Sequence, residues 1–507
     1  MRGPSSSHCA AAVRIGRLAK DLMGGKIREV LVQFDPNGSL ASTHESQGSD
    51  LGLFAGLLGW DMDDDRLVDA PAALWEAGIS VRIEITDIGA QHPNTYKLTL
   101  KHPETVHHMT AVSTGGGMVE VVDIDGIAVC ICGDFFETLI FVESAEQEII
   151  EHLKQYVKEE QILFYRGERK KLIEIKSQHD LDDRLLRELK SMRNVIEIAR
   201  LKPVMPILSR PNIKVPFITC KEILDYNKQK EKQLWELAIL YERARGDVSE
   251  ADILEKMGTI VDVMRNSVTR GIAGTRWEDR ILGYQCGSFK KNMENRKLLE
   301  AGMLNTMILY AAATMEAKSA MGVIVAAPTA GSCGVLPGAC LGAADFLNLP
   351  REDIVKALLA AGMIGVFISE HSTFAAELCG CQAECGAGSG MAAAALVTLA
   401  GGTLDQALAA TSMALQNIFG MVCDPVANRV EVPCLGKNIL AVSNALASAN
   451  MALADFDPVI PLDEVIEAMD RVGRSIPCEL RCTALGGLSV TKTSLRIQEE
   501  LTAKARR

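Results

Sequence analysis

The stretch ETLIFVESAEQEIIEHLKQYV (residues 137–157) begins with a strand-like run and continues into a helical pattern. QILFYRG (161–167) and KKLIEIKS (170–177) again predict strands, DLDDRLLRELKSMRN (180–194) predicts a helix, and VIEIARLKPV (195–204) predicts a last strand. The order β-α-β-β-α-β is that of the ferredoxin-like split βαβ fold. The sequence therefore predicts a ferredoxin-like module at residues 136–215.

The segments on either side of this module differ from it and from each other. Residues 1–135 mix helical and strand patterns, and IREVLVQFDP (27–36), VRIEITDI (81–88) and TYKLTLKH (95–102) alternate like half-buried strands. After the charged connector CKEILDYNKQKEKQ (220–233), the chain becomes rich in Ala, Gly and Met, and strand signals are scarce. We predict a multi-domain protein with an α+β domain at 1–135 and an all-α domain at 216–507.

The overall composition narrows the class of protein. Of the 507 residues, 48% are hydrophobic and 23% charged, as in an ordinary globular protein. A net charge of −12 without a basic stripe, and an aromatic content of 5%, argue against nucleic-acid binding. No signal peptide and no apolar run long enough for a membrane span are recognisable. We expect a cytoplasmic protein whose 14 cysteines are reduced or bound to metal.

Three cysteines, Cys381, Cys423 and Cys434, are flanked by glycine, proline and small residues, which present thiols on turns and helix ends. Thiolates are the natural ligands of iron–sulfur clusters, and three ligands on a cubane would leave one iron open for Lewis-acid chemistry. Zinc is an alternative, although the spacing Cys379-x-Cys381-xxx-Cys385 lacks the second pair of a structural zinc site. Small buried thiols are another alternative. Spacing alone leaves these three interpretations open.

Two glycine- and hydroxyl-rich segments are candidates for substrate binding. In GPSSSH (3–8), Ser5, Ser6 and Ser7 precede the helical stretch AAVRIGRLAKDL, so they predict either an anion site at a helix N-terminus or a simple N-cap. From its residues alone, PTAGSCG (328–334) predicts a glycine-rich helix break.

Longer motifs carry a resemblance to a known family. MGVIVAAPTAGSCGVLPG (321–338), GCQAECG (380–386), AAALVTLAGGT (393–403), VCDPVANRVEVPC (422–434) and ALGGL (484–488) resemble the catalytic part of the iron–sulfur-dependent L-serine dehydratases. GPSSSH, LGLFAGLLGWDMDDDRL (51–67), HPNT (92–95) and STGGGMVEVVDIDG (113–126) are similar to that family's β portion. The ferredoxin-like segment resembles the ACT regulatory module that some members carry.

The resemblance implies a function and a site. It implies that Cys381, Cys423 and Cys434 hold a [4Fe-4S] cluster, and that the enzyme is a lyase that eliminates water from L-serine to give pyruvate and ammonia. It further implies substrate-binding roles for the two segments above and for one histidine; the residues are Ser5, Ser6, Ser7, Thr329, Gly331, Ser332 and His371. A homodimer with a small-molecule substrate, and neither nucleic acid nor membrane as a partner, is expected.

The sequence departs from the family pattern near the chemistry. SQGSD (46–50) places Gln47 where the family has a histidine, and a carboxamide cannot act as a base. His44 or His8 is therefore the expected general base. His371 stands where an asparagine is usual, and no cysteine follows Cys482, so a capping tail cysteine is not expected.

These departures leave two alternatives to an L-serine dehydratase. The first is an iron–sulfur dehydratase or desulfidase for a related small amino or hydroxy acid. The second is a non-catalytic protein that senses an amino acid through the ferredoxin-like module.

Overall fold

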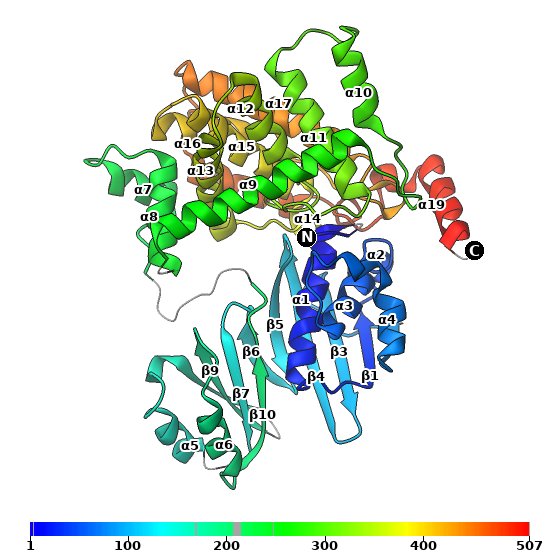
Figure 1. Ribbon diagram of the computed structural model, residues 1–507, viewed down its shortest axis with the longest axis vertical. Helices are drawn as coiled ribbons and strands as arrows, with labels where there is room; N and C mark the ends of the chain where they lie inside the picture. Colours follow the sequence, from blue (N-terminus) through cyan, green and yellow to red (C-terminus); the bar gives the residue numbers. More distant parts are fainter. Residues whose placement is uncertain (4, 145, 168–169, 206–213, 247, 506–507) are drawn as a thin grey trace.

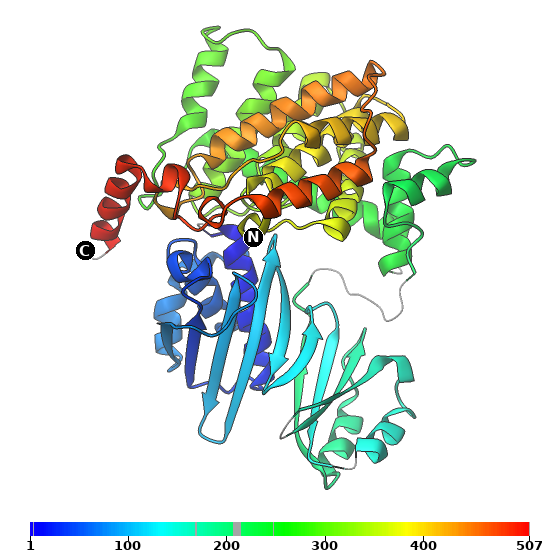
Figure 2. The same cartoon turned by 180° about the vertical axis from the view of Figure 1, so that it is seen from behind.

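The structure is a computed structural model that describes residues 1–507 except 4, 145, 168–169, 206–213, 247 and 506–507 (Figure 1). It contains an N-terminal sheet region, a ferredoxin-like module and a helical region, in that order along the chain. Figures 1 and 2 show the sheet region directly against the helical region, with the module beside the sheet region.

The N-terminal sheet region is built on a six-stranded sheet of order β2-β1-β3-β4-β5-β6. Its strands are β1 (Glu29–Phe34), β2 (Ser80–Ile85), β3 (Thr95–His102), β4 (Thr105–Gly115), β5 (Met118–Ile124) and β6 (Ile127–Ile131), and only β1 and β2 run parallel to each other. The accompanying helices are α1 (Ser6–Leu22), α2 (Leu40–Thr43), α3 (Ser49–Leu58) and α4 (Ala70–Glu76). The predicted strands at 27–36, 81–88 and 95–102 are confirmed.

Glycines set the close crossing of α1 and α3. A Cβ atom on Gly52 would lie 2.2 Å from the Cys9 carbonyl oxygen, and one on Gly56 would lie 2.2 Å from the Val13 carbonyl oxygen. Only residues without a Cβ allow this approach. The crossing fixes the start of α1, where the GPSSSH segment lies.

The module has the expected topology. Its strands β7 (Phe136–Val142), β8 (Ile162–Arg166), β9 (Lys171–Ser177) and β10 (Val195–Leu201) form an antiparallel sheet of order β10-β7-β9-β8, with α5 (Glu146–Leu153) and α6 (Asp183–Ser191) on one face. This is the ferredoxin-like arrangement. Membership of the ACT family stays a prediction, as do the domain limits; the predicted boundary at 215/216 closely follows residues 206–213, which lie outside the described part.

The other face of the module sheet packs on the N-terminal region. Leu139, Phe141 and Leu172 belong to the same hydrophobic core as the strands of the six-stranded sheet. The buried His107 of β4 lies 2.9 Å from an Asp125 carboxylate oxygen and 3.2 Å from a Glu197 oxygen on β10. Apolar packing and an ion-pair network therefore join the two units.

The helical region contains one isolated β-bridge and no strand among its described residues. Its helices are α7 (Cys220–Asn227), α8 (Leu234–Gly246), α9 (Glu250–Ala273), α10 (Gln285–Glu294), α11 (Met303–Ser319), the π-helical η3 (Pro337–Leu341), α12 (Gly342–Leu347), α13 (Arg351–His371), α14 (Ala376–Cys379), α15 (Cys385–Leu399), α16 (Leu404–Gln416), α17 (Cys434–Leu453), α18 (Leu462–Ser475) and α19 (Lys492–Ala505). The predicted all-α character is confirmed for the described residues.

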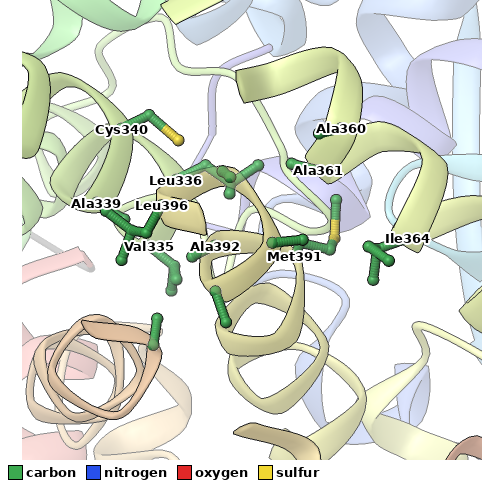
Figure 3. Packing of buried hydrophobic residues seen from close by; sticks show 14 of the residues in the cluster. Val335, Leu336, Ala339, Cys340, Ala360, Ala361, Ile364, Met391, Ala392 and Leu396 are labelled. Carbon is green, nitrogen blue, oxygen red and sulfur yellow. The ribbon is translucent and has the colours of Figure 1, made fainter. Parts of the chain in front are cut away.

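Helix α15 is the centre of this region and packs against α13, α16 and α17. Its run of small residues is buried on all sides, and Met391, Ala392 and Leu396 meet side chains of the neighbouring helices (Figure 3). One described helix, α13, is long and apolar enough to cross a membrane, but 67% of its most apolar window is buried inside the protein. The central packing holds in place the loops that carry the cysteines.

Candidate active site

Three segments of the helical region present Cys381, Cys423 and Cys434. Cys381 begins the short 3₁₀ helix η4 (Cys381–Ala383), Cys423 is bridged to Arg481, and Cys434 is the first residue of α17. All three are buried, with 2%, 6% and 6% of their surface exposed. A position at a helix N-terminus favours the thiolate form that metal ligation needs, which applies to Cys434.

Cys381 lies within electrostatic reach of both Cys423 and Cys434. A hydrogen bond with Cys482, burial and the charge of nearby Cys381 raise the pKa of Cys423 well above its ordinary value. Burial and the charge of Cys381 likewise raise the pKa of Cys434. Thiols crowded in this way stay protonated when no metal is bound. A bound metal would instead favour the thiolate form.

This donor set fits an iron–sulfur cluster because it is buried and consists of sulfur. Among the described residues, no three His, Cys, Asp or Glu side chains converge closely enough to hold a single metal ion, which a zinc site would require. A cubane does not need that convergence, because each thiolate binds a different iron.

Two further thiols border the set. The Cys482 backbone N–H donates to the Cys423 carbonyl at 2.8 Å, and the Cys385 thiol hydrogen-bonds that of Cys381. The short spacing in GCQAEC pointed to Cys385, whereas no local signal pointed to Cys482. Only the return of the chain onto Cys423 reveals it.

The start of α1 reaches across to the helical region through His8. The Ser5 Oγ lies 2.8 Å from His8 Nδ1, and His8 Nε2 lies 2.9 Å from Glu377 Oε1. Burial would lower the pKa of His8, but the hydrogen bond and charge of Glu377 outweigh it and raise the pKa. Ser5 occupies the N-cap position without a side-chain cap bond, so its hydroxyl serves the histidine instead.

The neighbouring serines differ in their contacts. Ser7 Oγ accepts a hydrogen bond from the Ala330 N–H at 2.8 Å, which joins α1 to the PTAGSCG loop. Ser6 Oγ donates to the Gly3 carbonyl at 3.0 Å and is fully buried. The two predicted substrate segments are thus in direct contact, although Pro4 lies outside the described residues.

The PTAGSCG loop is folded around the carboxyl group of the half-buried Glu384. Thr329 Oγ1 donates to Glu384 Oε1 at 2.6 Å and lies 3.1 Å from Ser332 Oγ. A Cβ on Gly331 would lie 2.6 Å from the same Glu384 oxygen. Asn438 of α17 donates to the Gly331 carbonyl at 2.7 Å and to the Cys434 carbonyl at 2.8 Å, so the loop is fixed to a cysteine-bearing helix.

His44 has the geometry of an oriented base. Its Nδ1 lies 2.8 Å from Asp50 Oδ2, and its ring centroid lies 5.2 Å from that of Phe34. Burial would lower the pKa of His44, but the hydrogen bond and charge of Asp50 raise it. No described group hydrogen-bonds Nε2, which leaves that nitrogen free for a substrate.

The loop that carries His44 lies against the helical region. The Gln47 amide nitrogen is 3.8 Å from Cys482 Sγ, and its amide oxygen is buried without a hydrogen-bond partner among the described atoms. Arg429, between Cys423 and Cys434 in the chain, donates to the Ser46 carbonyl at 3.3 Å. The residue that replaces the family histidine is therefore directed toward the cysteines.

His371 stands apart from this network. It is the last residue of α13, and its Nε2 is buried without a partner among the described atoms. No hydrogen bond or ion pair within the described part joins it to the other predicted site residues. Ser7 contacts the loop that carries Thr329, Gly331 and Ser332, and no such contact of the described residues connects His371 to them.

Sequence reasoning missed two acids, the buried Glu377 and the half-buried Glu384. Burial would raise the pKa of Glu377, but the hydrogen bond and charge of His8, with a hydrogen bond from Asn94, lower it. Burial raises the pKa of Glu384, and Thr329 only partly offsets this. The motifs AAEL and GCQAE contain the two glutamates. A glutamate near a cysteine is not a specific signal of a site, however, unless its hydrogen-bond or ion-pair partner is known.

A histidine and a lysine were also missed. His92, in the HPNT motif, accepts a hydrogen bond from the Asn94 N–H at 3.1 Å, and burial lowers its pKa although nearby Glu377 opposes the shift. Lys318 on α11 is fully buried, donates to the Val430 carbonyl, and has a pKa lowered by burial. Nothing in the local sequence distinguishes Lys318 from an exposed helix lysine.

Known proteins are similar to the part of the chain that carries the three cysteines. The family model for the serine dehydratase alpha chain matches residues 221–489. A probable L-serine dehydratase alpha chain of Bacillus subtilis is 37% identical over 285 residues, which is 56% of this chain and 95% of that protein. The L-serine dehydratase alpha chain of Peptoniphilus asaccharolyticus is 38% identical over 287 residues, covering 56% and 97%. L-serine dehydratase 1 of Escherichia coli is 30% identical over 286 residues, covering 55% and 63%.

The match spans more than half of the chain and includes all three cysteines, Glu377, Glu384 and the PTAGSCG loop. The expected resemblance is therefore confirmed at the level of the family, and so is the expectation of a lyase. The chain belongs to the serine dehydratase alpha chain family.

Proposed function

We propose that this protein is a [4Fe-4S]-dependent L-serine dehydratase that yields pyruvate and ammonia by elimination of water. The observation that carries the proposal is the set of three buried thiols beside the junction of α1 and the PTAGSCG loop. Cys381, Cys423 and Cys434 would hold the cluster, which when bound supplies a Lewis-acidic iron to the departing hydroxyl. The names of the matched relatives support serine as the substrate.

We assign the substrate carboxylate to the hydroxyl-rich junction between the two regions. Ser5, Ser6 and Ser7 line the α1 side, and Thr329, Gly331 and Ser332 line the facing loop. Hydroxyl and backbone donors at a helix start are suited to a carboxylate, and they stabilise carbanion character at the adjacent carbon. His371 stays a predicted substrate residue on the strength of the motif alone.

We propose His44 as the general base in preference to His8. Asp50 orients the His44 ring and leaves Nε2 free to accept the α-proton of the substrate. Both nitrogens of His8 are occupied by protein partners. Loss of water would leave an enamine, which hydrolyses spontaneously to pyruvate and ammonia.

The cluster assignment is tested by comparing Cys434→Ser with Cys130→Ser in protein purified without oxygen. Cys130 points away from the core on β6 and is exposed, because it alternates with the inward-facing Val129 and Ile131. Cys434→Ser should lose most of its bound iron, sulfide and visible absorbance, whereas Cys130→Ser should keep all three. Full iron and sulfide content in Cys434→Ser would refute the assignment.

The base assignment is tested with His44→Ala, and with His108→Ala as the control. His108 is exposed, its ring lies 3.1 Å from Thr99 Oγ1, and its backbone N–H donates to Asp125 Oδ1. We expect His44→Ala to lower kcat by about 10²- to 10⁴-fold at unchanged iron content, because a base contributes that much. Unchanged turnover in His44→Ala would transfer the role to His8 or another group.

A related small acid is the alternative substrate, and Gln47 is the observation that favours it. Its unpaired buried amide oxygen can accept a hydrogen bond from a substrate group near Cys482, a role that the family histidine would fill differently. Anaerobic turnover against serine, threonine, cysteine and simple hydroxy acids decides the question. Preference for any acid over serine by kcat/KM would replace serine in the proposal.

We also propose how the enzyme assembles and how it is regulated. The ferredoxin-like topology supports an ACT-type module that binds an amino-acid effector, and we propose a cytoplasmic homodimer on the family resemblance. Equilibrium sedimentation tests the dimer. A shift of the unfolding temperature with glycine or serine, lost when residues 136–215 are replaced, tests the effector site.

A further inference from the structure

Three side chains in contact, joined by one hydrogen bond and one ion pair, cross from the N-terminal region to the helical region. Ser5 Oγ and His8 Nδ1 are 2.8 Å apart, and His8 Nε2 and Glu377 Oε1 are 2.9 Å apart. The side chains of His8 and Glu377 are 11% and 5% exposed, so water competes weakly for these bonds. Ser5 and His8 belong to the start of α1, and Glu377 belongs to α14.

Glu377 is held on its own side as well. The Asn94 side chain of the HPNT motif hydrogen-bonds it, and α14 is part of the segment that leads to Cys381. The charged and titratable groups that act on His8 are Glu377 and Glu384 from the helical region, and His92 faces Glu377 from the loop before β3. Both carboxylates favour a positively charged His8.

A doubly protonated imidazole donates from both of its nitrogens. When the ion pair with Glu377 keeps His8 charged, its Nδ1 carries a proton and donates it to Ser5 Oγ. The serine oxygen is then an acceptor from the histidine, and its own O–H proton has to point elsewhere. Ser7, two residues further along the chain, contacts Ala330 of the PTAGSCG loop, so Ser5 lies near that junction.

We propose that Glu377 is a positioning residue, which holds His8 as a fixed cation so that the Ser5 hydroxyl is directed to donate its proton to the substrate carboxylate. The inference rests on the proposed function for the identity of the substrate. In this arrangement His8 orients the Ser5 hydroxyl, and His44 abstracts the proton from the substrate. It also makes the carboxylate site depend on contact between the two regions.

Glu377→Gln tests the proposal, because it keeps the size of the side chain and removes the charge. We expect the NMR titration of ¹⁵N-labelled His8, assigned with His8→Gln, to move to lower pH in the holoenzyme. KM for serine should rise about tenfold with a smaller change in kcat, and Glu377→Asp should restore part of the loss. Glu370→Gln, an exposed glutamate at the end of α13, is the matched control and should change neither quantity.

A double-mutant cycle separates a positioning role from a general structural one. If Glu377 acts through Ser5, the KM effects of Glu377→Gln and Ser5→Ala should be strongly non-additive. Additive effects, or an unchanged His8 titration in Glu377→Gln, would overturn the proposal. The His8 titration and the iron content are measured without turnover, so a protein that does not dehydrate serine would refute the proposed function and leave this test intact.

Discussion

At the scale of single residues, Gly331 shows how little room the site allows. Glu384 accepts the Thr329 hydroxyl, and the space beside its carboxyl group is filled by the Gly331 backbone. Because the position is glycine, the loop can fold onto a half-buried acid. The loop and the acid therefore depend on each other for their positions.

Gly331→Ala should damage activity more than stability. The new methyl group would lie 2.6 Å from Glu384 Oε1 and force that side chain away from Thr329. We expect a loss of about 1 kcal/mol in the free energy of unfolding and at least a tenfold loss in kcat/KM. Chemical denaturation and steady-state kinetics measure the two effects.

Gly362→Ala on α13 is the control, since nothing lies within 4 Å of a Cβ at that position. It should stabilise the helix by about 0.5–1 kcal/mol and leave turnover unchanged. Equal behaviour of the two variants would contradict the proposed tight contact between Gly331 and Glu384.

At the scale of elements, the α1–α3 crossing determines where the GPSSSH segment can lie. Gly56→Ala would bring a methyl group to 2.2 Å from the Val13 carbonyl oxygen and 2.9 Å from Gly16 Cα. Since these are backbone atoms, the helices must separate, and we expect a cost of about 1–3 kcal/mol in the free energy of unfolding. Denaturation compared with Gly362→Ala measures it, and a neutral effect would show that the crossing is loose.

At the scale of the whole molecule, His107 ties the module to the N-terminal region. Burial would lower the pKa of His107, but its bonds to Asp125 and Glu197 raise it from 6.5 to about 9. A raised folded-state pKa means that the stabilisation is complete below pH 6.5 and is lost as the pH rises through about 9. The interaction between the module and the N-terminal region is therefore strongest in mildly acidic solution.

The free energy of unfolding should accordingly fall between pH 6.5 and 9, by an amount on the order of 1–3 kcal/mol from this histidine. His107→Gln keeps a hydrogen-bonding group but removes the titration, and should reduce the slope over that range. Denaturation at several pH values measures it. Identical slopes in the two proteins would show that other groups dominate.

Part of the fold and of the site could be predicted from the sequence, and part could not. Strands such as β7 and β9 were predictable because short apolar runs and β-branched residues are local properties. The ligand set Cys381, Cys423 and Cys434 came from family motifs and not from spacing, which also allowed zinc. Glu377 was not predictable, because its meaning depends on His8, which lies at the other end of the chain.

The sequence by itself determined the order of elements in the module, the helical nature of the last part of the chain and the family, since periodicity and motifs are written along one dimension. Only the tertiary structure decided which hydroxyls meet, that Cys482 lies beside Cys423, and that His8 is held by Glu377 while His44 keeps a free nitrogen. The physical reason is that burial, hydrogen bonding and charge coupling act through space, between segments that no local pattern connects.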